Sequence, residues 1–252
     1  MIKLKSVSSG YGKKEVVSSV TASFERRKLT AVIGPNGCGK STLLKTISGI
    51  IPLMSGNITA DGGDISKMKR GEIAKKITYL SQGRDVPDMT VSQLVLHGRF
   101  PHLSYPRRYG ERDREIARLA MERMGIYNLS DERVRDLSGG VRQSAYIAMA
   151  LTQETDCILF DEPSTYLDIS HSLSLMRQMR ELAEGGRAIV TVMHDIPMAL
   201  DFADDVIVMQ SGRIVMQGSP CDIVESDVIR DIFGVGVNQR SAGGQTRFEY
   251  DY

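Results

Sequence analysis

Short apolar runs alternate along this chain with segments in which apolar residues recur every three to four positions. The runs have the length of buried strands, whereas the other segments have the periodicity of amphipathic helices. Strands that alternate with helices favour an α/β fold with a mainly parallel sheet. We expect strands of this sheet at 29–33, 77–80, 157–160, 188–193 and 206–209.

The alternation is interrupted between about 85 and 155. Apolar positions in this stretch have helical spacing, and no convincing strand pattern occurs there. We therefore predict that a helical insertion divides the α/β core. Its expected helices include 91–96, 116–124 and 146–151.

Both ends of the chain differ from the central pattern. Strand-like segments near the N-terminus predict a small antiparallel β layer that contains 2–7, 16–24 and 57–60. From 238 onward Gly, Ser, Gln and charged residues dominate. This composition is typical of a loosely held tail.

Composition narrows the classes of function. A length of 252 residues suits one α/β domain with an insertion. The 32 basic and 31 acidic residues give a net charge of +1, so we expect no nucleic-acid partner. Apolar runs such as 147–151 are far shorter than the roughly 18 residues of a membrane span. The first residues also lack the apolar stretch of a signal peptide, so we expect neither a membrane crossing nor export.

Cysteines and histidines do not predict a metal site. Cys38, Cys157 and Cys221 are odd in number and share no C-x-x-C spacing, which disfavours a disulfide framework or a zinc site and indicates a cytosolic redox context. Pro101 separates His97 from His102 and spoils helical ligand spacing, and His171 has no clustered partner along the sequence.

The clearest motif fits the phosphate-loop pattern G-x-x-x-x-G-K-[ST]. It lies between the expected strand 29–33 and a helix expected to begin near Lys40, which is the context that a P-loop requires. Glycines let backbone N–H groups turn inward, and the Lys40 ammonium can reach the β- and γ-phosphates. The alternative is a glycine-rich turn with a surface lysine. We expect ATP to bind at Gly34, Pro35, Asn36, Gly37, Cys38, Gly39, Lys40, Ser41 and Thr42.

Two details of this loop carry further expectations. Ser41 has the hydroxyl that P-loops place on Mg²⁺. Cys38 lies inside the loop, and we expect a maleimide to label its thiol and Mg-ATP to slow that labelling.

Polar residues follow two other expected strands. Asp161 and Glu162 follow an apolar strand, where ligands of open α/β sheets bind. We expect Asp161 to orient Mg²⁺ and Glu162 to polarise the attacking water. His194 ends the strand 188–193 and opens on the same edge, so it is a candidate for a hydrogen bond to the γ-phosphate or the water. Without a P-loop, two such acids would be read as a solvated loop or a helix cap.

The run of Leu137, Ser138, Gly139 and Gly140, upstream of Asp161 and downstream of the P-loop, makes the chain resemble the ATP-binding cassette (ABC) ATPases. The same letters alone could be a helix cap. The resemblance extends from Tyr11 to about 218. It implies an α/β P-loop NTPase core of RecA-like type, at about 1–84 and 156–220, with the helical subdomain at about 85–155. It further implies one ABC ATPase domain over 1–236 and a tail at 237–252.

The resemblance also implies roles for individual residues. Tyr11 is similar to the aromatic that stacks on adenine, although it could simply cover the first strand. Gln82 is similar to the glutamine that ligates Mg²⁺ and senses a permease, and a plain loop residue is the alternative. The loop 164–168, with Asp168 at its end, resembles the segment that crosses the dimer interface. Implied nucleotide contacts from the partner chain are Ser138, Gly139 and Gly140, so the expected assembly is a head-to-tail homodimer with two ATP sites.

The family pattern is not complete in this chain. Val141 stands where glutamine usually follows the two glycines, and Ser144 stands where arginine is common. Valine cannot donate a hydrogen bond, but Ser138 and the backbone amides can still form the anion site.

Two segments, 95–102 and 165–169, resemble importers of iron-siderophore, haem or cobalamin type, and we expect an iron-siderophore. That resemblance implies integral-membrane permease subunits, a solute-binding protein and a peripheral place on the cytoplasmic face of the membrane. The exposed surface around 91–99 is the expected receiver of the permease signal. A soluble cassette ATPase of DNA repair or ribosomes is the main alternative, and a P-loop kinase would not explain Ser138, Gly139 and Gly140 together with His194.

Overall fold

A six-stranded sheet forms the centre of the fold in the computed structural model, which describes residues 1–83, 86–165, 167–242 and 245–251. Its strand order is β10-β9-β3-β8-β7-β6, and the neighbours from β9 to β6 are parallel. The strands are β3 (Lys28–Ile33), β6 (Ile77–Leu80), β7 (Cys157–Asp161), β8 (Ala188–Val192), β9 (Asp205–Gln210) and β10 (Arg213–Gly218). The five predicted strands are confirmed, whereas the antiparallel edge strand β10 was not predicted.

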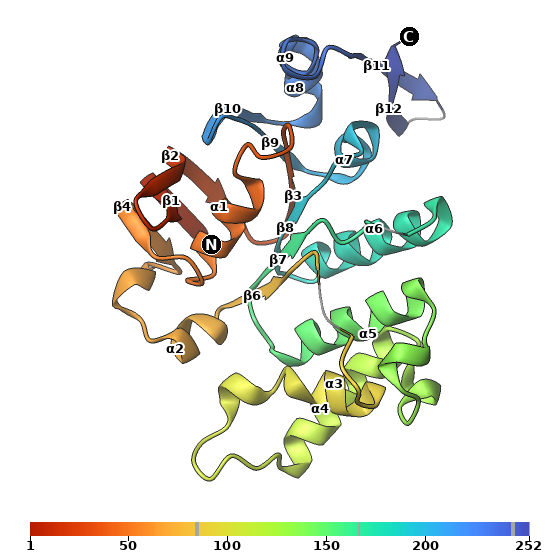
Figure 1. Cartoon of the computed structure of the whole chain (residues 1–252). Helices are drawn as coiled ribbons and strands as arrows, with labels where there is room; N and C mark the ends of the chain where they lie inside the picture. Colours follow the sequence, from red (N-terminus) through yellow and green to blue (C-terminus); the bar gives the residue numbers. More distant parts are fainter. Residues whose placement is uncertain (84–85, 166, 243–244, 252) are drawn as a thin grey trace.

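A smaller antiparallel sheet covers one side of this core, as predicted from the N-terminal pattern. Its order is β2-β1-β4-β5, and it contains β1 (Ile2–Tyr11), β2 (Lys14–Phe24), β4 (Leu53–Ala60) and β5 (Gly63–Asp64). The helix α1 (Lys40–Ile47) lies between the two sheets (Figure 1) and buries Leu43, Leu44 and Ile47 completely. The small sheet therefore presses α1, and the loop before it, against the central strands.

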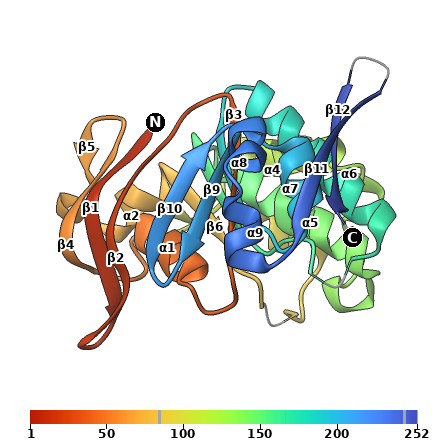
Figure 2. The same cartoon turned by 90° about the horizontal axis from the view of Figure 1, so that it is seen from above.

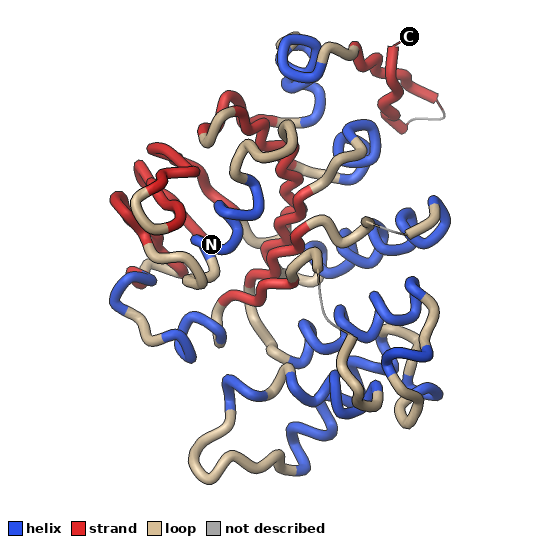
Figure 3. Tube along the Cα trace, viewed as in Figure 1, coloured by secondary structure: helices blue, strands red, loops and turns tan. Residues whose placement is uncertain are grey.

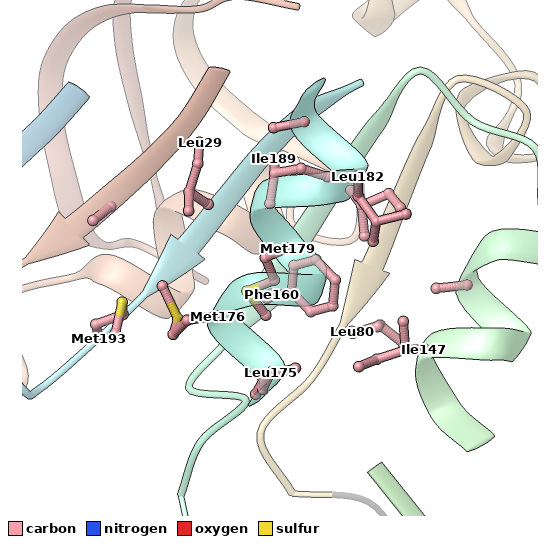
Figure 4. Packing of buried hydrophobic residues seen from close by; sticks show 14 of the residues in the cluster. Leu29, Leu80, Ile147, Phe160, Leu175, Met176, Met179, Leu182, Ile189 and Met193 are labelled. Carbon is pink, nitrogen blue, oxygen red and sulfur yellow. The ribbon is translucent and has the colours of Figure 1, made fainter. Parts of the chain in front are cut away.

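The opposite face of the central sheet is covered by α6 (Ile169–Glu184) and α7 (Ile196–Phe202). Figure 4 shows Leu175, Met176, Met179 and Leu182 of α6 directed at the sheet, beside Phe160 of β7. These five side chains are at most 3% exposed. Apolar strands buried between two layers explain why the sequence has continuous hydrophobic runs rather than alternation.

The predicted insertion is helical in the described residues of the segment. It contains α3 (Val91–His97), α4 (Glu111–Arg123) and α5 (Gly139–Thr152), preceded by the short α2 (Arg70–Ala74). The helices α3, α4 and α5 form a group beside the sheet (Figure 1, Figure 3) and contribute to the apolar cluster that also contains Phe160 and the buried face of α6. Gly98 follows α3 and must be glycine, because a Cβ there would lie 2.0 Å from the Met149 carbonyl oxygen of α5.

One expectation about the surface of the insertion is wrong. Arg99 does not belong to an exposed face, because it is only 5% exposed. Its guanidinium donates to Asp113, Glu154 and the Thr152 carbonyl at 2.6–2.9 Å. This arginine therefore joins the end of α3 to the end of α5, and Gln93, His97 and Phe100 provide the exposed positions of the same stretch.

The C-terminal segment is also different from the loosely held tail that its composition predicts. After α8 (Pro220–Glu225) and α9 (Val228–Phe233), β11 (Gly236–Ala242) and β12 (Gln245–Asp251) form an antiparallel hairpin beside α7 (Figure 2). Phe248 is 7% exposed, and its N–H donates to Asp201 of α7 at 2.9 Å. The expectation of a loose tail is wrong because aromatic side chains bury the hairpin against the core.

Candidate active site

The phosphate loop joins β3 to α1 at the carboxyl edge of the central sheet. Gly39 lies at the N-cap of α1 with φ of 106°, a left-handed conformation that favours glycine, and no side chain caps the helix there. The first amides of α1 are therefore left for an anion. Lys40 is buried, and its Nζ donates to the carbonyl oxygens of Gly34 and Pro35 at 2.8 and 3.1 Å. The lysine thus lies folded over its own loop.

A cleft of about 280 Å³ opens over this loop. Its lining comprises Val16, Asn36, Gly37, Gly39, Lys40, Ser41, Thr42 and Glu162. Tyr11 is not among these residues; it ends β1, where its side chain is 53% exposed. Adenine stacking on Tyr11 therefore stays a prediction.

Asp161 lies at the end of β7 and is 3% exposed. Its Oδ1 accepts a hydrogen bond from Ser41 Oγ, and its Oδ2 accepts one from the Tyr79 hydroxyl, both at 2.8 Å. Sequence reasoning did not identify Tyr79, although a hydroxyl in an otherwise apolar strand is a signal that such a strand reaches a polar site.

Ser41 and Asp161 form a suitable pair of ligands for Mg²⁺. A hydroxyl and a carboxylate supply the hard oxygen atoms that this ion prefers. Within the described ranges no group of three or more His, Cys, Asp and Glu side chains could hold a metal ion. In proteins Mg²⁺ is usually bound by one or two carboxylates together with substrate phosphates and water.

Glu162 is the point at which three predicted residues meet. Its Oε1 lies 2.7 Å from His194 Nε2, which follows β8, and its Oε2 accepts a hydrogen bond from Gln82 Nε2, which follows β6. Thr165 Oγ1 donates to the same Oε2 at 3.4 Å. The three adjacent strand ends explain why residues 80 positions apart converge. Sequence reasoning did not single out Thr165.

Backbone conformation also marks Glu162. Its φ is 50°, in the left-handed region that non-glycine residues seldom occupy. Such strain persists where surrounding contacts fix the residue, and it occurs often at functional sites. The side chain is 13% exposed, so the carboxylate is held at the rim of the cleft.

The Ser138, Gly139 and Gly140 motif opens α5 on the helical insertion. Ser138 is the N-cap, and its Oγ accepts from Val141 N–H at 3.5 Å. None of the three residues lines the cleft over the phosphate loop. A second cleft of about 250 Å³ has Gly139, Arg142 and Gln143 on one side and Gln82 and Thr165 on the other.

The loop 164–168 follows Glu162 and ends at Asp168, the N-cap of α6. Tyr166 lies outside the described residues. The Asp168 carboxylate accepts from the His171 N–H and faces His171 Nδ1, each at 2.8 Å. Hydrogen bonds from the His171 backbone, the His171 ring and Ser170 lower the pKa of Asp168 to about 2.

The Cys38 thiol is not open to reagents as the sequence suggested. Cys38 is 6% exposed, and its Sγ lies beneath Gly34, where a Cβ would be 2.7 Å away. Burial raises the pKa of this thiol. The backbone of Cys38 belongs to the phosphate loop as expected, but its sulfur points into the core.

The chain is similar to known proteins in both sequence and fold. Residues 17–165 match the family described as "ABC transporter". The chain is 42% identical over 228 residues to the ferric enterobactin transport ATP-binding protein FepC of Escherichia coli (strain K12), covering 90% of this chain and 84% of the relative. It is 39% identical over 228 residues to the iron(3+)-hydroxamate import ATP-binding protein FhuC of Bacillus subtilis (strain 168), covering 90% and 85%.

Among solved structures, a putative metal-chelate type ABC transporter in an inward-facing conformation has a TM-score of 0.85. The match covers 100% of this chain and 97% of that one at 23% identity, so it supports the fold. None of the helices in the described part of the chain has the length and apolar character that a bilayer crossing demands.

Proposed function

Because the chain belongs to the ABC transporter family, whose members use ATP hydrolysis to drive transport, we propose that it is the ATPase subunit of an importer for ferric siderophores. The observation that carries the ATPase assignment is the cleft that Lys40, Ser41 and Glu162 line together. The solute class rests on the relatives that carry ferric enterobactin and iron(3+)-hydroxamate in their names.

ATP binding begins with the exchange of partners at Lys40. Its Nζ leaves the carbonyl oxygens of Gly34 and Pro35 and donates to β- and γ-phosphate oxygens, which form stronger charge-assisted hydrogen bonds. The amides of the loop and of the first turn of α1 surround the phosphates. Asn36, Gly37, Cys38, Gly39 and Thr42 contribute to this cradle mainly through the backbone.

Mg²⁺ would be held by Ser41 Oγ, the Asp161 carboxylate and Gln82. It would neutralise negative charge on the β- and γ-phosphates. Tyr79 has a supporting role, because its hydroxyl donates a hydrogen bond to Asp161 Oδ2. The other carboxylate oxygen, Oδ1, stays on the side of Ser41.

Hydrolysis needs a water in line with the bond between the γ-phosphorus and the ADP oxygen. Glu162 accepts a proton from that water. At the same time the water oxygen attacks the γ-phosphorus, and the bond from phosphorus to ADP breaks. His194 Nε2 lies 2.7 Å from Glu162 Oε1 and holds the carboxylate; the same N–H would turn to a γ-phosphate oxygen when ATP binds. Gln82 approaches the other carboxylate oxygen and thereby connects the hydrolytic centre to the segment that enters the helical insertion.

The second half of the nucleotide site comes from another copy of the chain. Ser138, Gly139 and Gly140 do not line the cleft that holds Lys40, yet they open a 14-residue helix, and the first amides of a helix have no partner within the helix backbone. A head-to-tail homodimer would face these amides to the γ-phosphate on the partner's loop. The loop that ends at Asp168 would cross the same interface, and hydrolysis would remove the anion that joins the two copies.

We propose integral-membrane permease subunits and a solute-binding protein as further partners, with the chain peripheral on the cytoplasmic face of the membrane. The chain should be co-expressed with its candidate permease, purified and placed in liposomes. Binding protein loaded with a ferric siderophore should raise ATP hydrolysis, whereas haem- or cobalamin-loaded binding proteins should not. Hydrolysis that ignores the permease and responds to DNA or ribosomes would contradict the importer assignment.

A further inference from the structure

We propose that His171 is a positioning residue that fastens the loop ending at Asp168 to the glycine pair at the start of α5. This inference rests on the proposed function, in which both elements face the partner's ATP. His171 lies in the first turn of α6, on the core, whereas Gly140 lies on the helical insertion. Figure 1 shows α5 and α6 beside each other.

The ring of His171 is held from one side by Asp168. Nδ1 lies 2.8 and 2.9 Å from the two carboxylate oxygens, so Nδ1 is the protonated nitrogen that donates to them. Ser170 Oγ adds a hydrogen bond to Oδ1 at 2.9 Å. This arrangement fixes the plane of the imidazole and directs its opposite edge toward α5.

The opposite edge lies against Gly140. A Cβ built on Gly140 would be 2.2 Å from His171 Cδ2 and 2.6 Å from Nε2, closer than real side chains approach. Gly140 has no left-handed φ that would itself demand glycine. The imidazole, not the backbone conformation, therefore occupies the space that a side chain at this position needs, and a larger residue fits only if the half-exposed ring turns away.

Gly139 provides a contrast within the same motif. A Cβ on Gly139 would have no atom within 4 Å in this chain. One face of the glycine pair is thus open for a ligand, while the other is covered by His171. Below the ring, α5 and α6 enclose only a small cleft of about 30 Å³, whose lining includes Gln143, Ser144 and Leu167.

The consequence is mechanical. The loop from Glu162 to Asp168 continues directly into His171, so a shift of that loop moves the ring that rests on Gly140. His171 therefore fixes the position of the glycine-pair amides relative to the loop. The amides and the loop can then contact the same γ-phosphate on the partner copy. Without the ring, nucleotide binding to the phosphate loop should persist, whereas closure of the dimer on ATP should weaken.

A double-mutant cycle tests the contact. Gly140→Ala should lower thermal stability and ATPase activity, and adding His171→Ala should recover part of both, because the steric conflict disappears. Gly139→Ala is the matched control, since His171→Ala should give it no recovery. His171→Asn retains a donor near Asp168 without the ring edge, so it should relieve Gly140→Ala as well.

The functional arm uses His171→Ala alone. We expect the apparent KM for ATP and the ATP concentration that half-saturates dimerisation to rise by about three- to tenfold, in the lower half of the range for a contacting pair. Binding of a fluorescent ATP analogue to the monomer should change little, and kcat at saturating ATP should change less than KM. His171→Asn should recover the part of this effect that comes from holding Asp168.

Additive stability effects of Gly140→Ala and His171→Ala, with unchanged ATP dependence in His171→Ala, would overturn the inference. The stability cycle needs no ATP, so it decides the contact even if the wild-type chain neither dimerises nor hydrolyses ATP. A wild-type chain that neither dimerises nor hydrolyses ATP would instead refute the proposed function.

Discussion

Replacement of Glu162 by glutamine is the sharpest test of the hydrolytic centre. The carboxylate is nearly enclosed and contacts His194, Gln82 and Thr165. The glutamine side chain has the same shape, and its amide oxygen can still contact His194. Its NH₂ group, however, replaces the carboxylate oxygen that accepts hydrogen bonds from Gln82 and Thr165. Both neighbours can adapt, because the Gln82 amide can turn over and the Thr165 hydroxyl can accept. The substitution should therefore leave the fold and the phosphate loop intact.

The substitution should slow the hydrolysis step itself. Loss of a positioned general base lowers a rate by about 10²–10⁴-fold, or about 3–5 kcal/mol of barrier. Glu162→Gln should reduce phosphate release at saturating Mg-ATP by that factor and should retain wild-type affinity for the nucleotide. The ATP-bound dimer should also persist longer, because in the proposed mechanism it dissociates after hydrolysis.

The assay compares phosphate release, binding of a fluorescent ATP analogue and dimer lifetime on gel filtration. Glu184→Gln is the matched control, since Glu184 is an exposed carboxylate at the end of α6, remote from the cleft. Hydrolysis by Glu162→Gln within about threefold of wild type, less than any positioned base contributes, would refute the role of Glu162. Equal loss of nucleotide binding and hydrolysis would show that the carboxylate maintains the loop rather than activates water.

Three further predictions follow from contacts outside that carboxylate. Maleimide should label Cys221 before Cys38 and Cys157 in the folded protein, as mass spectrometry of the peptides can show, because the latter two are buried and burial raises their pKa. Tyr79→Phe should lower the free energy of unfolding by about 1–3 kcal/mol in urea titrations, because the buried Asp161 Oδ2 loses its donor. Phe248→Ala should cost about 3 kcal/mol in the same assay, whereas Arg247→Ala, which removes a partly exposed ion pair with Asp201, should cost less than about 1 kcal/mol.

The sequence was sufficient wherever chemistry is local. The phosphate loop is a contiguous run, and the polar residues after 157–160 and 188–193 follow strands that parallel pairing brings to one edge. Convergence of Glu162 and His194 was therefore foreseeable from strand ends, whereas Gln82 was named from the resemblance to the ABC ATPases. Thr165 was harder to identify, because its contact depends on the path of the loop after Glu162 and no strand pattern encodes that path.

Two elements, β10 and the C-terminal hairpin, were not predicted, although the sequence contains a signal for each. The edge strand β10 follows a tight turn at Ser211 and Gly212, both with positive φ, and such a pair between apolar runs is typical of a hairpin. In the C-terminal segment, polar composition suggested disorder, whereas Phe248 and Tyr250 alternate with charged residues as in a half-buried strand. Arg99 illustrates the opposite limit, because nothing in the local sequence predicts that three acceptors, from α4, from the end of α5 and from the turn after it, surround its guanidinium.

The cleft between the core and the insertion links the surroundings of Glu162 to α5. Gln82 and Thr165, which both contact Glu162, also line this cleft, and Gly139 and Gln143 of α5 face them across it. Any movement of the insertion that widens or narrows the cleft must therefore change the surroundings of the two side chains that hold the Glu162 carboxylate. Because packed elements shift between discrete arrangements rather than deform continuously, a permease that docks on the insertion, as the sequence predicts, would bias hydrolysis without touching the nucleotide.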